Sequence, residues 1–103
     1  MARLVRSPQA KRDIAEVLAY TRERWGTERA FAYATLIREA LEAIAADPGI
    51  GKPRGELRPG VVAHHIARRG RPARHLLFYR VSASGTVEII RFLHDSMDFE
   101  RHL

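Results

Sequence analysis

The sequence predicts an α+β domain in which an N-terminal strand and an antiparallel helical hairpin pack on a curved, mainly antiparallel β-sheet, in the order β-α-α-β-β-β. Two observations lead to this prediction. Apolar residues recur at helical spacing in the first half of the chain, and runs rich in β-branched and aromatic residues replace that pattern in the second half. With 103 residues and no internal repeat or linker, the chain 1–103 is expected to form a single domain.

The first half begins with an extended segment at residues 3–6 and continues as two helices. Ser7 can cap the first helix, and Pro8 fits its first turn, where a missing backbone N–H costs nothing. Gly26 is expected to end this helix, and Asp47-Pro48-Gly49 to end the second. Because so few residues connect the two helices, they are expected to pack as an antiparallel pair. The apolar stripe of the first helix is predicted to contain Ile14, Val17, Leu18, Thr21 and Trp25, and that of the second Ala30, Ala34, Ile37, Leu41 and Ile44.

The second half opens with a basic loop, residues 49–60, that is rich in glycine and proline. Three strands are predicted after it, at Val61–Ala67, Arg74–Ser82 and Thr86–His94. Gly70-Arg71-Pro72 separates the first two, and a turn at residues 83–85 joins the last two into a hairpin. Because the last two runs are apolar on both faces, they are expected to be central strands.

The side chains of the last two strands are assigned to two faces by alternation. Those predicted to pack on the helices are Leu77, Tyr79, Val81, Ile90 and Phe92, whereas Arg80 and Arg91 share the opposite face with Phe78 and Ile89. Both arginines are expected at matched positions near the strand centres. A charged side chain at the centre of a sheet is stabilised by a partner that covers it, by water in a groove or by a carboxylate. Glu88 and Asp95 are the candidate carboxylates.

Positive charge is concentrated in the second half of the chain. Residues 1–48 hold eight basic and seven acidic side chains, whereas residues 49–103 hold ten and five, which gives the total of +6. Arginine, which pairs bidentately with phosphate or carboxylate, accounts for sixteen of the eighteen cations. The pattern indicates an anionic partner, either nucleic acid or an acidic protein segment, although arginine used only for solubility gives the same composition.

Several function classes are not expected. The chain has no cysteine, which excludes a disulfide or a thiolate metal site, and it has no glycine-rich phosphate-binding loop. No metal or other cofactor is therefore expected. The apolar runs are too short to span a membrane, and no signal peptide is recognised, so a soluble cytoplasmic protein without membrane contact is expected.

Segments spread over nearly the whole chain resemble a known family. They are Ser7–Ile14, Tyr20, Pro48–Gly51, Leu57–Val61, Phe78–Val81, Ile90–Asp98 and Arg101–Leu103. The most specific is the terminal pattern Leu93-His94-x-x-Met97-Asp98. On these segments the chain resembles the ParE branch of the RelE/ParE superfamily, the toxins of type II toxin–antitoxin, or plasmid-stabilisation, modules of bacteria.

The resemblance implies a toxin that a small ParD-like antitoxin neutralises in a hetero-oligomer. RelE-like members are ribosome-dependent mRNA endonucleases that rely on basic residues and usually a C-terminal tyrosine, whereas ParE-like members inhibit DNA gyrase and lack that catalytic set. Because no tyrosine follows Arg91, the leading interpretation is a gyrase inhibitor that is not an enzyme and does not itself bind a specific DNA sequence. A metal-independent endoribonuclease and a non-toxic binding protein are the alternatives.

Three sets of site residues follow from this interpretation. The residues predicted to contact the target are Arg80, Arg91, His94, Met97 and Asp98. The endoribonuclease alternative uses Lys52, Arg54, Arg80, Arg91 and His94. The antitoxin is predicted to bind Tyr20, Trp25, Phe31 and Tyr33, because four such rings cannot all enter the core of a small domain. Met97 is expected to pack on the sheet, and Asp98 to pair with Arg91 or Arg101.

The aromatic residues of the helical hairpin are flanked by arginines, and this combination suits an amphipathic helix that carries acidic side chains. A free edge of the sheet can also pair with an extended segment of the same antitoxin.

Overall fold

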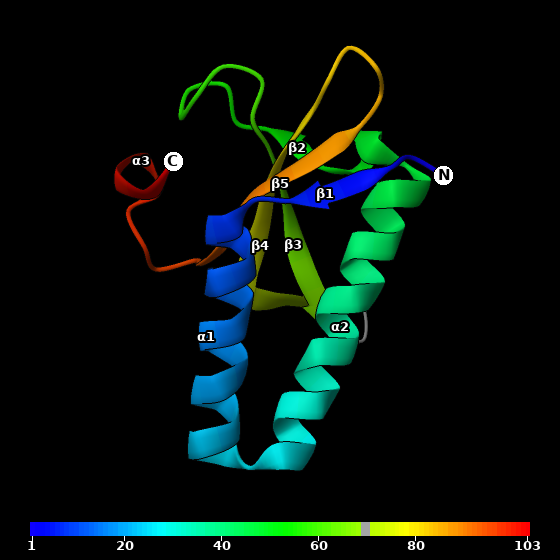
Figure 1. The fold of residues 1–103 in the computed structure, drawn as a ribbon. Coiled ribbons are helices and arrows are strands. Elements are labelled where there is room, and N and C mark those ends of the chain that lie inside the picture. Colours follow the sequence, from blue (N-terminus) through cyan, green and yellow to red (C-terminus); the bar gives the residue numbers. More distant parts are fainter. Residues whose placement is uncertain (69–70) are drawn as a thin grey trace.

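The computed structural model describes residues 1–68 and 71–103 and confirms the α+β class. Two long helices, α1 (Pro8–Trp25) and α2 (Thr27–Ala46), form an antiparallel hairpin on one side of a sheet (Figure 1). The strands are β1 (Leu4–Arg6), β2 (Lys52–Pro53), β3 (Val62–Arg68), β4 (Arg71–Val81) and β5 (Val87–His94). A 3₁₀ turn at Pro48–Ile50 follows α2, and a short helix, α3 (Phe99–His102), ends the chain.

The sheet has the order β1-β5-β4-β3-β2, so β4 and β5 are central as predicted. β1 runs parallel to β5, and all other neighbours are antiparallel. β2 pairs only with Val62 and Ala63 of β3. In the part of the chain that the structure describes, the rest of β3, from His64 to Arg68, is therefore an open edge.

The start and end of α1 follow the predicted capping pattern. The Ser7 hydroxyl accepts the N–H of Ala10 at 3.0 Å and donates to the Ile90 carbonyl at 2.7 Å, which ties the start of α1 to β5. Gly26 ends the helix with a φ of 99°, a conformation that favours glycine, and the chain reverses there into α2.

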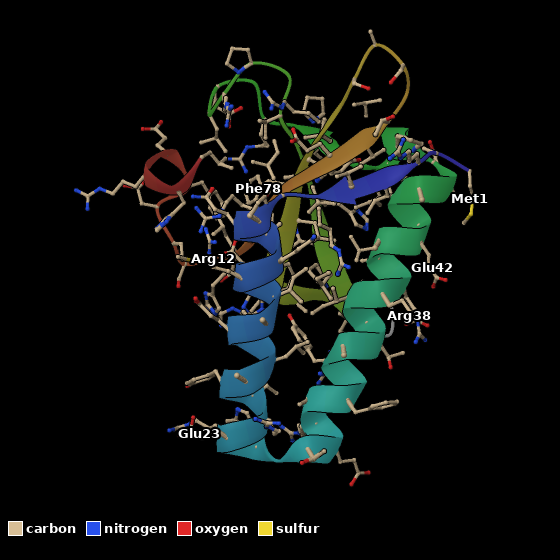
Figure 2. The ribbon with its side chains drawn as sticks, viewed as in Figure 1. Met1, Arg12, Glu23, Arg38, Glu42 and Phe78 are labelled. Carbon is tan, nitrogen blue, oxygen red and sulfur yellow. The ribbon has the colours of Figure 1, made fainter. Side chains whose placement is uncertain are left out.

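Apolar side chains form a cluster on each face of the sheet. The first cluster lies between the sheet and the two helices and contains Ile14, Tyr33, Ile37, Ala40, Ile44, Leu77, Tyr79, Val87, Ile89 and Phe92. The second cluster, on the opposite face, contains Val61, Ala63, Leu76, Phe78, Ile90 and Leu93, and is covered by Leu57, Phe99 and Leu103. Figure 2 labels Arg38 and Glu42 on the side of α2 that faces away from α1.

A bulge in β5 corrects the predicted assignment of faces. Phe78 pairs with Arg91 and Tyr79 with Ile89, so Ile90 is an extra residue in the ladder. As a result Ile89 packs toward the helices and Ile90 toward the second cluster, the reverse of the prediction. Val81, predicted to be buried, is 45% exposed because it lies at the end of β4.

Apart from shifts of one residue at strand ends, the predicted elements were wrong at three places. β4 begins at Arg71, so Arg71 and Pro72 belong to the strand and not to a break; Arg69 and Gly70 lie outside the described residues. The strand β2 and the helix α3 were not predicted, because each is too short to show a periodic pattern. In residues 1–68 and 71–103, no helix has the length and apolar character required to cross a membrane.

Tyr79 connects the loop after α2 to the sheet. Its hydroxyl donates to the Pro48 carbonyl at 2.7 Å and accepts the Gly51 N–H at 3.1 Å. A Cβ atom on Gly51 would lie 2.6 Å from the Tyr79 oxygen and also collide with Val62. This close approach requires glycine at position 51.

Candidate functional site

A groove of about 690 Å³ opens between α1, the tip of the helical hairpin, the start of β4 and the C-terminal segment. Its apolar and aromatic lining includes Val17, Tyr20, Trp25, Tyr33, Phe92 and Met97. Charged side chains also line it, with Glu16 on α1 and Arg29, Arg68 and Arg71 from the hairpin tip and the adjoining strands. An apolar surface with charges around it is typical of a site that receives an amphipathic segment.

The floor of this groove is formed by three rings, Tyr33, His75 and Phe92. The Tyr33 hydroxyl lies 2.7 Å from Nδ1 of His75, and the His75 ring stacks on Phe92 with centroids 4.9 Å apart. Burial, followed by the nearby His94, lowers the pKa of His75 to about 4, and burial raises the pKa of Tyr33 to about 12. At neutral pH the floor is therefore uncharged, and the phenol O–H can donate a hydrogen bond to Nδ1 of the neutral imidazole.

The four predicted antitoxin-binding residues occupy different positions. Tyr20 and Trp25 line the groove and are 61% and 57% exposed, and the guanidinium groups of Arg24 and Arg29 lie 5.8 and 5.2 Å from the Trp25 ring centre. Tyr33 is buried in the floor of the groove. Phe31 is 74% exposed on α2, and it is not among the described residues that line the groove.

The two arginines predicted at matched positions are not matched, because Arg91 stands opposite Phe78, two residues before Arg80 on β4. Arg80 pairs with Glu88 in the register, and its guanidinium lies 3.0 Å from the Glu88 carboxylate. Of the two candidate carboxylates, Glu88 is therefore the partner of Arg80, whereas Asp95 pairs with Arg74 at 3.0 Å.

Arg91 is held in the interior by a residue that the sequence did not single out as a site residue. Its Nε and Nη2 donate to the two carboxylate oxygens of Asp13 at 2.7 and 2.9 Å, and its Nη1 donates to the His102 carbonyl at 2.7 Å. The side chains of Arg91 and Asp13 are only 15% and 13% exposed. The hydrogen bonds that Arg91 donates to Asp13 raise the pKa of Arg91 above its usual value. No spacing rule could have found Asp13, since its partner lies in the last strand.

The other predicted target-contact residues lie in the C-terminal segment. Nδ1 of His94 is 2.7 Å from the Ser96 hydroxyl, and Met97, 36% exposed, lines the groove. Asp98 lies 3.7 Å from Arg101, which identifies Arg101, and not Arg91, as its partner. His94 and Met97 therefore share the groove with the aromatic residues of the hairpin.

The residues of the endoribonuclease alternative do not converge. His94 stands opposite His75 in the register, whereas Arg80 lies five residues further along β4, a separation of about 17 Å along a strand. Arg54 bonds Glu56 at 2.6 Å and lies over the Phe99 ring on the second face of the sheet. Arg91 is occupied by Asp13 and the His102 carbonyl. The described side chains therefore do not form a pocket in which one phosphate contacts all of these groups.

Comparisons with known proteins indicate the family of the chain. A family model described as "ParE toxin of type II toxin-antitoxin system, parDE" matches residues 4–99. The chain is similar to Toxin ParE1 of Mycobacterium tuberculosis, with 36% identity over 102 residues, 99% of this chain and 98% of that protein. It is similar to Toxin ParE1 of Caulobacter vibrioides, with 41% identity over 97 residues, 94% of this chain and 93% of that protein.

A solved structure supports the fold. It is titled "Chromosomal ParDE TA system from P. aeruginosa", and it matches with a TM-score of 0.75 and 20% identity over 91% of this chain and 96% of the other. The family model and the relatives in the two bacteria show that the chain belongs to the ParE toxin family of type II toxin–antitoxin systems.

Proposed function

We propose that this chain inhibits DNA gyrase by binding to it, without cleaving nucleic acid, and that a ParD-like antitoxin neutralises it by binding in the groove. The observation that carries the non-enzymatic part is the separation of the basic residues that phosphoryl transfer needs. Acid–base and electrostatic catalysis both require groups within hydrogen-bond reach of one reacting centre. Here Arg80 and His94 stand about 17 Å apart along the hairpin.

The ion pairs support the same interpretation. Arg54, Arg80 and Arg91 each have a carboxylate partner, Glu56, Glu88 and Asp13 respectively. A cation that is already neutralised contributes less to binding an RNA phosphate than a free one, because the carboxylate must first be displaced. These ion pairs thus favour a toxin that binds its target over one that cleaves RNA with these residues.

The surface proposed for gyrase is the C-terminal segment together with partly exposed side chains of β4 and β5. It includes His94, Met97, Asp98 and Arg80, all of which have exposed atoms. Such a toxin acts in the bacterial cytoplasm, where gyrase works, and we place this chain there.

The groove supports the proposal for the antitoxin. Tyr20 and Trp25 present open ring surface, and large aromatic residues in a concave site are the usual anchors of a protein interface. Arg29, Arg68 and Arg71 beside them suit acidic side chains on an amphipathic helix. The open edge of β3 suits an extended segment of the same partner. The net charge of +6 accelerates the encounter with an acidic chain.

Induction of the chain in bacterial cells, with and without the neighbouring small open reading frame, tests this function. Gyrase inhibition predicts DNA breaks and filamentous cells while mRNA stays intact, and co-expression of the antitoxin restores growth and yields a copurifying hetero-oligomer. A prompt stop of translation with mRNA cut at codon positions would instead identify an endoribonuclease. Normal growth with no copurifying partner would contradict both parts of the proposal.

A further inference from the structure

The C-terminal segment, residues 95–103, is held in place by contacts with the rest of the domain. α3 has only four residues, far fewer than an isolated helix needs in water. Its Phe99 ring meets Phe78 edge-on with centroids 4.8 Å apart, and Leu103 packs on the same cluster. In Figure 1, α3 lies at the side of the sheet, away from α2. The position of this segment therefore depends on a few tertiary contacts.

One polar contact connects this segment to both the sheet and α1. Arg91 uses two of its nitrogens on Asp13 and the third on the His102 carbonyl. That carbonyl lies at the end of α3, where no intrahelical N–H is available to it. Asp13 also accepts the Phe92 N–H at 3.0 Å, so its carboxylate is fixed relative to β5. The Arg91 guanidinium is thus oriented by Asp13 on one side and donates to the C-terminal segment, at His102, on the other.

We propose that Arg91, oriented by Asp13, is a positioning residue that holds the C-terminal segment in its target-binding arrangement and does not itself contact the target. This inference rests on the proposed function in one respect, the role of the segment in binding gyrase. It changes the role of Arg91 from the one that the sequence predicted. Only a planar guanidinium presents three nitrogens in a fixed geometry that can bind a carboxylate bidentately and a carbonyl at the same time.

The Arg91→Lys variant tests the positioning role because it keeps the charge beside Asp13 and loses the third contact. NMR amide exchange reports the segment directly, since the Leu103 N–H donates to the Phe99 carbonyl at 3.0 Å. We expect this amide to exchange at least about tenfold faster in Arg91→Lys, while core amides such as that of Ile37 keep their rates. Arg101→Lys is the matched control, because Arg101 is in the same segment but is 83% exposed, and its effect should stay within about twofold.

The result that overturns the proposal is an unchanged Leu103 exchange rate in folded Arg91→Lys. If that variant does not fold, Asp13→Asn replaces it, since asparagine keeps the shape and one acceptor oxygen; it should raise the rate about threefold, and no change would again overturn the proposal.

Gyrase inhibition then separates positioning from direct contact. Phe99→Ala loosens the segment and leaves Arg91 intact, so it should raise the half-inhibitory concentration about as much as Arg91→Lys does, roughly tenfold. Full inhibition by Phe99→Ala, with the segment shown to be loose, would mean that Arg91 acts directly and would overturn the proposal. Absence of inhibition by the unmodified toxin would refute the proposed function, whereas the exchange measurements would still decide whether Arg91 positions the segment.

Discussion

Replacement of Trp25 by alanine is the most informative perturbation of the groove. Trp25 is 57% exposed at the groove and is the only tryptophan in the chain. A tryptophan side chain has roughly 250 Å² of surface, so about 140 Å² stays open in the free toxin. If an antitoxin covers half of that surface, at about 25 cal/mol per Å², the lost contact is worth about 1.8 kcal/mol, or roughly a 20-fold weaker Kd.

Titration calorimetry with the purified antitoxin measures this loss, and the fluorescence of Trp25 in the unmodified toxin reports burial of the ring on binding. The variant should remain folded, because Trp25 does not belong to either apolar cluster. Phe31→Ala is the matched control: it removes an aromatic ring that is more exposed and does not line the groove, and it should change Kd less than about threefold. An unchanged Kd for folded Trp25→Ala would refute the groove as the antitoxin site, and a larger loss for Phe31→Ala would move the interface to the outer face of α2.

Three further predictions concern the groove floor and the loop after α2. Tyr33→Phe leaves Nδ1 of His75 without its partner at 2.7 Å and should cost about 1–2 kcal/mol in urea unfolding. The pKa of His75 is lowered from 6.5 to about 4, so as pH falls the unfolded chain binds the proton first, and stability decreases between these two values. The loss from pH 7 to pH 5 should be about 2 kcal/mol, and His75→Gln should remove that part of the slope in unfolding measured against pH. Gly51→Ala forces a Cβ against the Tyr79 hydroxyl and should cost about 1–3 kcal/mol, whereas Gly55→Ala, with open space around it, should be nearly neutral in the same thermal unfolding assay.

Much of the fold could be predicted because its signals are local. The hairpin of α1 and α2 follows from capping residues and periodic apolar positions, and Ser7 and Gly26 act as the sequence predicted. The central position of β4 and β5 follows from their apolar character on both faces. The bulge at Ile90 could not be predicted, since strict alternation is the only rule that sequence offers within a strand.

The candidate site was harder to predict because it depends on pairs that are distant in sequence. In the floor of the groove Tyr33 contacts His75. Beside the C-terminal segment, Arg91 donates to Asp13, which is 78 residues away in the sequence. The sequence placed Tyr33 among the aromatic residues on the hairpin surface. In the structure Tyr33 is buried, and its hydroxyl forms a hydrogen bond with the neutral ring of His75. For Arg91 the sequence left a partner, a hydrated groove or a nearby carboxylate open, whereas Asp13, a carboxylate from the other end of the chain, holds it. The rings of Tyr20 and Trp25 are exposed, as predicted, because the tip of the helical hairpin extends beyond the start of β4 (Figure 1).

DNA supercoiling by purified gyrase, measured with the purified toxin in the presence of intact ribosomes and mRNA, tests the proposed function most directly. We predict that the toxin stops supercoiling, that equimolar antitoxin restores it, and that the mRNA remains uncut. Normal supercoiling at a saturating toxin concentration, together with cleavage of the ribosome-bound mRNA, would contradict the proposal of a non-enzymatic gyrase inhibitor.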